Sequence, residues 1–206
     1  MNLFKIALGI SLISTPSFAA TNTCRYEVDP TSVKVGWTAF KTTEKTPVQG
    51  TLKDVEIKTP MKSVKNLVGL LARVKASGLV DSEKKSDSGK PERDHTLFEK
   101  FFSLISFHGK FEGSFVNIVG DEKAGTLDLS LIFNNKTKKV PMKYTLSAEN
   151  ALEVEGEFDL NNFGAEAPLA SLHQACEQLH KGKDGVSKTW PNVGLKISAK
   201  ITKNCK

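Results

Sequence analysis

The sequence TLDLSLIF occupies residues 126–133, and after NNKT at 134–137 the chain continues with VPMKYTL at 140–146. Apolar residues take every second position in both segments, first from Leu127 to Phe133 and then from Val140 to Leu146. A period of two is that of a β-strand with one buried face. Paired asparagines favour a tight turn. The region therefore predicts a β-hairpin that packs one face against a core.

Alternation of the same kind runs through most of the chain after residue 30. We expect further strands at 33–40, 48–58, 73–80, 107–119, 152–160 and 193–201. The pattern at 48–58 is blurred, which indicates a bulge. Together with the hairpin, these segments predict an all-β protein of eight strands.

Eight long antiparallel strands would leave adhesive edges if the sheet stayed open. Closure into a barrel removes those edges, and an eight-stranded barrel leaves room for its own side chains or for one small ligand. We therefore expect an eight-stranded antiparallel barrel with short helices. Apolar spacing predicts these helices at 61–71, 91–102 and 168–180, and the polar segment 82–90 is expected to be a mobile loop.

The first twenty residues have the pattern of a secretory signal. Lys5 gives the positive start, residues 6–13 are apolar, and Ser17-Phe18-Ala19 is a small-x-small cleavage pattern. The apolar run is far shorter than the ~20 residues that a membrane span needs. We expect cleavage after Ala19 or Ala20, a single domain over residues 21–206, and a periplasmic location.

An exported chain can form disulfides. Cys24 and Cys205 lie near the two ends of the chain, with Cys176 between them. If the terminal strands lie side by side and antiparallel, these ends meet. We therefore predict a Cys24–Cys205 disulfide that leaves Cys176 unpaired, the alternative being three reduced thiols.

Charge and motifs argue against several classes of function. Only three of the 29 basic residues are arginine, whereas nucleic-acid readers rely on the arginine fork. We expect no nucleic-acid partner, and the net charge of +6 indicates a solvated lysine surface with at most transient contact with a membrane surface. No Gly-x-Ser-x-Gly, His-Glu-x-x-His or phosphate-binding loop is present, so we expect no enzyme and no cofactor.

His173, Cys176 and His180 share one face of the third predicted helix, a spacing at which a metal site is conceivable. Cys176 also lies on the apolar stripe of that helix, where a small thiol packs well. With no fourth ligand nearby in sequence, we expect no metal.

Ordered short motifs link the chain to a known family. They are YEVD at 26–29, VGWTAFK at 35–41, GTL at 50–52, VDS at 80–82, RDH at 93–95, GTL at 125–127, NNKTKKV at 134–140 and GEFDL at 156–160. In this order they resemble the YceI-like family of lipocalin-type, polyisoprenoid- and lipid-binding periplasmic proteins. The segment 165–188 departs from the shorter family connection and is expected to be a helical insert.

The resemblance implies a lipocalin-like barrel that holds a long amphiphile, such as an isoprenoid quinone, a polyprenyl phosphate, a fatty acid or a fatty amide, in an apolar lumen. It also implies that Arg93 and Asp94 fix the start of a helix rather than touch the ligand. The candidate lining residues are Trp37, Phe40, Phe98, Phe101, Phe102, Phe107, Phe111, Phe115, Leu129, Leu131, Tyr144 and Phe158. Trp37 and Phe40 have opposite strand phases, so at most one of them faces inward in a regular strand.

Two other functions stay open at this point. The phenylalanines could fill the barrel, leaving a stress-response or interaction protein without a ligand. An enzyme acting on a bound lipid is the weaker alternative, because no nucleophile and base are recognisable. A homodimer also stays open, because barrels of this type can pair through their open ends.

Overall fold

The computed structural model describes residues 24–59 and 63–205, so the expected signal segment lies outside the described residues. The described strands are β1 (Cys24–Val28), β2 (Lys34–Lys41), β3 (Thr46–Leu52), β4 (Glu56–Lys58), β5 (Lys75–Gly78), β6 (Ser86–Asp87), β7 (Phe111–Gly120), β8 (Ala124–Phe133), β9 (Lys136–Leu146), β10 (Ala151–Asp159) and β11 (Thr189–Cys205). The α-helices are α1 (Leu67–Leu71), α2 (Pro91–Lys100), α3 (Ser106–Gly109) and α4 (Glu166–Ala175). Short 3-10 turns are η1 (Pro30–Ser32), η2 (Glu83–Lys85), η3 (Phe102–Leu104), η4 (Leu160–Phe163) and η5 (Glu177–His180).

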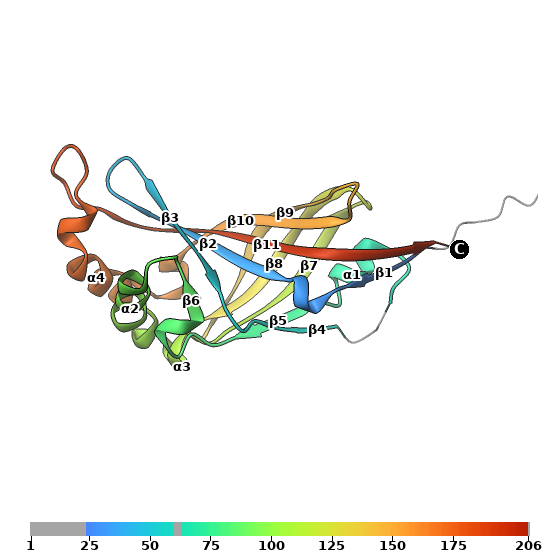
Figure 1. Cartoon of the computed structure of the whole chain (residues 1–206), viewed down its shortest axis with the longest axis horizontal. Helices are drawn as coiled ribbons and strands as arrows, with labels where there is room; N and C mark the ends of the chain where they lie inside the picture. The colour runs from blue at the N-terminus through green and yellow to red at the C-terminus, as the bar shows by residue number, and fades with distance from the viewer. Residues whose placement is uncertain (1–23, 60–62, 206) are drawn as a thin grey trace, which may run out of the picture.

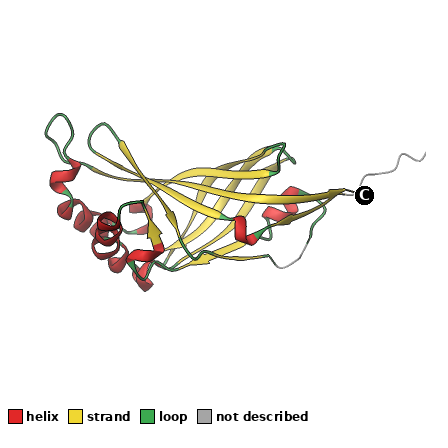
Figure 2. Ribbon diagram, in the orientation of Figure 1, coloured by secondary structure: helices red, strands yellow, loops and turns green. Residues whose placement is uncertain are grey.

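All the strands belong to one antiparallel sheet that curls into a half-barrel (Figure 1). Its order is β4-β5-β7-β8-β9-β10-β11-β2-β3-β6, and β1 pairs with the far part of β11. Among the described residues, the edge strands β4 and β6 do not pair with each other. Figure 2 shows α2, α3 and α4 gathered at one end of the sheet, which we call the helical end.

The hairpin predicted from residues 126–146 is confirmed. β8 pairs with β9, and the alternating side chains of Leu127, Leu129 and Leu131 are at most 7% exposed. Met142 and Tyr144 on β9 are buried on the same face. The apolar face of this hairpin therefore forms one wall of the interior.

The all-β antiparallel fold is confirmed, but the expected number of eight strands is wrong. The expected strand 48–58 is two strands, because Asp54 adopts a φ of 54° and turns the chain after Leu52. β4 then pairs with β5 at the opposite edge of the sheet. The blurred apolar pattern at residues 48–58 therefore reflects the break between β3 and β4, and not a bulge.

The expected strand 107–119 begins later than predicted. Phe107 and His108 adopt φ values of 55° and 53° within α3, and β7 starts only at Phe111. The Phe107 side chain is 67% exposed. The alternation through Phe107 and Gly109 therefore continued the strand pattern by coincidence.

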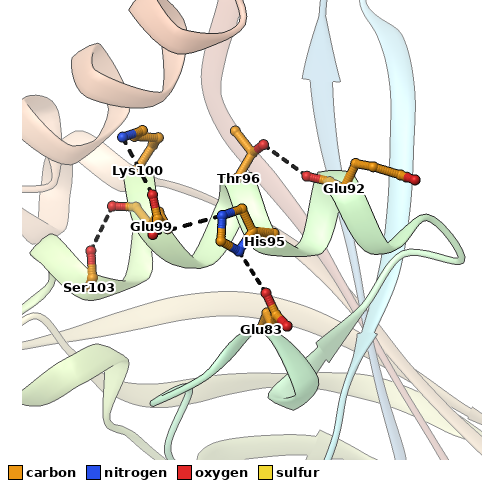
Figure 3. Close-up of polar contacts among 7 residues, drawn as sticks. All are labelled: Glu83, Glu92, His95, Thr96, Glu99, Lys100 and Ser103. Carbon is orange, nitrogen blue, oxygen red and sulfur yellow. Dashed lines mark hydrogen bonds and ion pairs between the residues drawn. The ribbon is translucent and has the colours of Figure 1, made fainter.

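The segment 82–90 is structured rather than a mobile loop. η2 leads into β6, which pairs with β3. His95 on α2 places Nδ1 2.7 Å from a Glu83 carboxylate oxygen and Nε2 3.8 Å from Glu99, so η2 is bound to the outer face of α2 (Figure 3). The β3–β6 pairing and the single His95–Glu83 contact thus hold a segment that its composition suggested was mobile, whereas the Glu99 contact lies within α2 itself.

The predicted helices are present but shorter. The helix expected at 61–71 is described only from Leu67, where the Asn66 side chain accepts from the Gly69 N–H at 2.7 Å and caps α1. Residues 61–62 lie outside the described residues. The helix expected at 168–180 divides into α4 and η5, in agreement with a helical insert within 165–188.

The two ends of the described chain meet, as predicted. Cys24 is opposite Cys205 in the β1–β11 register and forms a disulfide with it, with the two Cα atoms 3.9 Å apart. Cys176 is free. The disulfide lies at the end of the sheet remote from α2 and α4, which we call the closed end (Figure 1).

Candidate functional site: a chain of apolar cavities

The curled sheet encloses a cavity of about 170 Å³, which we call the inner cavity. β2 contributes Val35 and Trp37 to its lining, and β11 contributes Val193, Leu195 and Ile197. The other strands and the helices add Leu52, Ala76, Val80, Leu97, Phe101, Phe102, Phe111, Gly113, Leu129, Leu131, Phe133, Phe158, Leu160, Leu169, Leu172, Thr189 and Trp190, with Ala39 from β2. Of these lining residues among the described part of the chain, only Thr189 brings a hydroxyl, and none brings a charge.

Trp37 is fixed across the inner cavity by a buried hydrogen bond. Its indole Nε1–H donates to the Ser86 hydroxyl at 3.1 Å, and Ser86 is 2% exposed. The ring lies over Gly50 of β3, where a Cβ atom would collide with it. The short strand β6 and the glycine therefore hold this large side chain flat against the sheet.

Phenylalanine rings close the inner cavity beneath the helices. Phe101 stacks on Phe133 with ring centroids 6.5 Å apart, and Phe133 meets Phe163 edge-to-face at 6.0 Å. Phe158 continues the row at 5.4 Å from Phe163. Such pairs add stabilisation beyond the area they bury, so this wall is rigid and apolar.

Two further cavities adjoin the inner one. Towards the closed end, a distal cavity of about 50 Å³ shares Val35, Gly113 and Leu129 with it. Towards the helical end, an outer cavity of about 320 Å³ shares Trp37, Leu172 and Thr189 with it. The three cavities therefore lie in series along the barrel.

The outer cavity differs from the other two in its charge. It is bounded by the end of β2, the start of α2, and the α4–η5 segment. Its lining includes Lys41, Lys90 and Arg93, with Glu92 as the acidic residue. The polar mouth therefore lies at the helical end.

The histidines of the insert converge on Thr189. His173 Nδ1 lies 2.9 Å and His180 Nδ1 2.6 Å from its hydroxyl oxygen. Burial, with smaller effects of Lys41 and His173, lowers the pKa of His180 to about 4, so that imidazole is neutral at pH 7. Burial likewise raises the pKa of the Cys176 thiol.

The described residues contain no group of three or more potential metal ligands that could hold an ion. His173 and His180 use their Nδ1 atoms on a threonine hydroxyl instead. The spacing that made a metal conceivable thus serves to position Thr189 and the two imidazoles at the junction of the inner and outer cavities.

The predicted lining residues are distributed over all three cavities and beyond them. Trp37, Phe101, Phe102, Phe111, Leu129, Leu131 and Phe158 line the inner cavity. Phe115 lines the distal cavity, and Phe40 lines the outer one. Trp37 and Phe40 both line a cavity, although their side chains would point to opposite faces of a regular strand. The strand pairing is irregular at this level, because the register between β2 and β11 shifts between Thr189 and Val193.

Three predicted residues lie outside these linings. Tyr144 is fully buried and donates its hydroxyl to the Asp121 carbonyl at 2.8 Å, which is a structural role. Phe98 is half-buried on α2, where Leu97 lines the cavities instead. Phe107 is exposed on α3 for the backbone reason given above.

Sequence reasoning missed much of the β11 side of the inner cavity. Val193, Leu195 and Ile197 alternate clearly, so the signal was present in the strand pattern. Leu169 and Leu172 were visible as an apolar stripe, but nothing local indicated that α4 covers the barrel mouth. Thr189 and Trp190 carried no pattern at all.

No protein-family model matches this sequence, and a search of curated proteins finds no relative. Among solved structures, the fold is similar to that of a polyisoprenoid-binding domain from Saccharophagus degradans, with 10% identity and a TM-score of 0.55 over 85% of this chain and 96% of that domain. The YceI protein of Campylobacter jejuni matches at 11% identity and a TM-score of 0.48, over 78% of this chain and 86% of that one. At this identity the first likeness shows a shared fold, the antiparallel half-barrel, and nothing beyond it.

In the described part of the chain, no helix is long and apolar enough to cross a membrane.

Proposed function

We propose that this protein binds a long-chain amphiphile, such as an isoprenoid or a fatty-acyl lipid, by burying its tail in the half-barrel. The observation that carries the proposal is the inner cavity, whose lining contains no charged group and a single hydroxyl among the described residues. An interior filled by its own side chains would show no such cavity. The similarity to a polyisoprenoid-binding domain supports the same class of ligand.

The size of the cavities limits how a tail is held. Engineered apolar cavities of ~150 Å³ stay dry and take a guest as small as benzene. The inner cavity, at about 170 Å³, therefore takes one segment of a tail rather than all of it. A long tail must extend into the adjoining outer or distal cavity, or widen the passages between them.

Burial of the tail supplies enough free energy for binding without many polar contacts. Each buried methylene contributes about 0.8 kcal/mol, so ten methylenes contribute roughly 8 kcal/mol before the costs of association. The protein would thus act as a carrier or store that shields the tail from water. Together with the signal-like segment at residues 1–20, the disulfide supports a role in the periplasm.

The first test is to look for the ligand. Native mass spectrometry of protein purified from an exported source, followed by solvent extraction, is expected to show a co-purified lipid. Delipidated protein is expected to rebind a chain amphiphile at one per chain. Protein that is empty and also fails to bind added lipid would favour the filled-barrel alternative, and turnover of the extracted lipid would favour an enzyme.

A variant that fills the cavity tests the location of the tail. Gly113 lines the inner and distal cavities, and a Cβ atom there meets only the Leu129 side chain. Gly113→Leu is expected to lower lipid affinity about tenfold or more, because the new side chain occupies the tail's volume. Gly36→Leu is the matched control, since Gly36 lies outside the three cavity linings and a Cβ atom there meets only the Lys196 and Gly50 carbonyl oxygens, at contact distances of 3.5 Å and 3.7 Å. Equal affinities for the two variants would place the tail elsewhere.

A further inference from the structure

The outer cavity concentrates positive charge, because its lining contains three cationic side chains and one carboxylate, Glu92. Lys41 ends β2, Lys90 is the N-cap residue of α2, and Arg93 lies in the first turn of that helix. Among the described residues, no carboxylate lies within 4 Å of these three cations. Lysines close by do find partners, since Lys53 pairs with Asp87 at 3.0 Å.

Arg93 does not act as the family resemblance implied. Its neighbour Asp94 fixes the helix start, because the buried Asp94 carboxylate accepts the Ser88 N–H at 2.9 Å. Arg93 instead lines the outer cavity without an acidic partner in the described part of the chain. Asp94 therefore has the role of fixing the start of the helix, and this role does not require the side chain of Arg93.

Other groups around the mouth add to its positive potential. The first turn of α2 borders the cavity, but its Glu92 and Asp94 offset the positive end of the helix dipole, so the helix itself adds little to the potential. Lys45 and Lys188 lie 4.6 Å and 4.8 Å from the centre of the ring of Trp190, which lines the inner cavity. Lys41 is steadied by donating to the Leu179 carbonyl at 3.3 Å.

The polar and apolar parts of the site meet at one residue. Thr189 lines both the inner and the outer cavity, and its hydroxyl lies against the imidazoles of His173 and His180. A molecule that fills both cavities would pass from an apolar environment to a cationic one at this level. That is the polarity profile of an amphiphile with a charged head.

We propose that the outer cavity binds the anionic headgroup, a carboxylate or a phosphate, of the amphiphile whose tail occupies the inner cavity. This inference rests on the proposed function. Lys90 and Arg93 supply the charge, with Lys41 held at the opposite wall by η5. The α4–η5 insert closes the site, so the headgroup lies between the insert and α2.

Three probes of equal chain length but different headgroups separate the contribution of the headgroup to binding from that of the tail. Hexadecanol, palmitate and hexadecyl phosphate are titrated into delipidated full-length protein at low salt, and their dissociation constants are compared. The two anions are expected to bind about tenfold more tightly than the alcohol, because charge-assisted hydrogen bonds exceed neutral ones. Added salt is expected to reduce this difference, since the mouth is open to solvent.

The double variant Lys90→Gln with Arg93→Gln is expected to remove the preference for anions, because it weakens the binding of palmitate and hexadecyl phosphate far more than that of hexadecanol. Its matched control is Lys138→Gln with Lys139→Gln, which removes the same charge from exposed positions on β9 outside all three cavities. Circular dichroism of both variants confirms that the fold is retained. A preference that survives in the Lys90 and Arg93 variant, or disappears equally in the control, would overturn the assignment.

The outcomes separate this inference from the proposed function. Equal, salt-independent binding of all three probes would overturn the anionic headgroup site while the tail-binding function stands. Failure of all three probes to bind would contradict the proposed function itself. Preference for the phosphate alone or the carboxylate alone would support the site and identify its chemistry.

Discussion

The two ends of the half-barrel are built for different purposes. At the closed end, a disulfide joins β1 to β11, and Leu67, Leu70 and Leu71 of α1 are at most 2% exposed. At the helical end, α2 and the α4–η5 segment surround a cavity of about 320 Å³ that contains lysine and arginine side chains. Among the described residues, the cavity at the closed end is the distal one, of about 50 Å³, so the tighter packing and the charged opening lie at opposite ends of the barrel.

Loss of the disulfide is expected to have the largest effect on stability. Cys24→Ser, or reduction, releases a link between residues 181 positions apart, and closing so long a loop stabilises a fold by about 4 kcal/mol. Chemical unfolding under non-reducing conditions measures the change. Cys176→Ser, at the free thiol, is the control and is expected to change stability by less than about 1 kcal/mol. An unchanged free energy of unfolding in Cys24→Ser would show that the closed end does not depend on this link.

Two leucine truncations compare the packing of the two ends directly. Leu67→Ala is expected to cost about 3–4 kcal/mol, because Leu67 is 0% exposed, lies outside the three cavity linings, and its removal leaves a new void. Leu172→Ala is expected to cost about 2 kcal/mol, because Leu172 already borders the inner and outer cavities.

The two leucine truncations are expected to rank in the opposite order in their effect on lipid affinity. Leu172→Ala should alter lipid affinity, whereas Leu67→Ala should leave the affinity of the folded protein unchanged. Denaturant unfolding and lipid titration on each variant provide both measurements. Equal stability losses together with equal affinities would remove the distinction between the two ends.

The smallest expected effect is a pH dependence that originates at the helical end. The pKa of His180 is about 4 in the folded protein, below its ordinary value near 6.5, so the unfolded chain binds more protons between these values. The stabilisation from the neutral imidazole is complete above about pH 6.5 and is lost as the pH falls towards 4.

Thermal unfolding at pH 7, 5.5 and 4 is expected to show this fall in the wild-type protein and a weaker one in His180→Asn. His108→Asn serves as the control, because His108 is exposed and its positive φ of 53° suits asparagine. A His180→Asn variant that retains the full wild-type slope would assign the pH dependence to other groups.

Strands with one buried face could be predicted from sequence because burial itself imposes the pattern. Leu127, Leu129 and Leu131 alternate since every second side chain enters the interior. β6 could not be predicted in this way. It has two residues, and its pairing depends on the Trp37 indole reaching Ser86 from a strand 49 positions away.

The residues of the candidate site likewise divide into those that the sequence pattern predicted and those that it did not. Residues such as Leu129 and Phe158 were predicted because they lie on an alternating face of a regular strand. The mouth was not predicted, because Lys41, Arg93 and Thr189 come from distant segments and meet only when α2 and α4 dock on the barrel. Phe107 shows the opposite error, since a positive φ leaves no trace in an alternating pattern.

The position of β11 has a consequence for how the chain reaches its folded state. This last strand lies between β10 and β2 in the sheet and also pairs with β1, so it links the two halves of the molecule. A chain synthesised from its N-terminus cannot complete the sheet until its final residues emerge. Such long-range pairing slows folding, because β1 and one edge of β2 lack their partner strand until β11 is available, although β2 can already pair with β3.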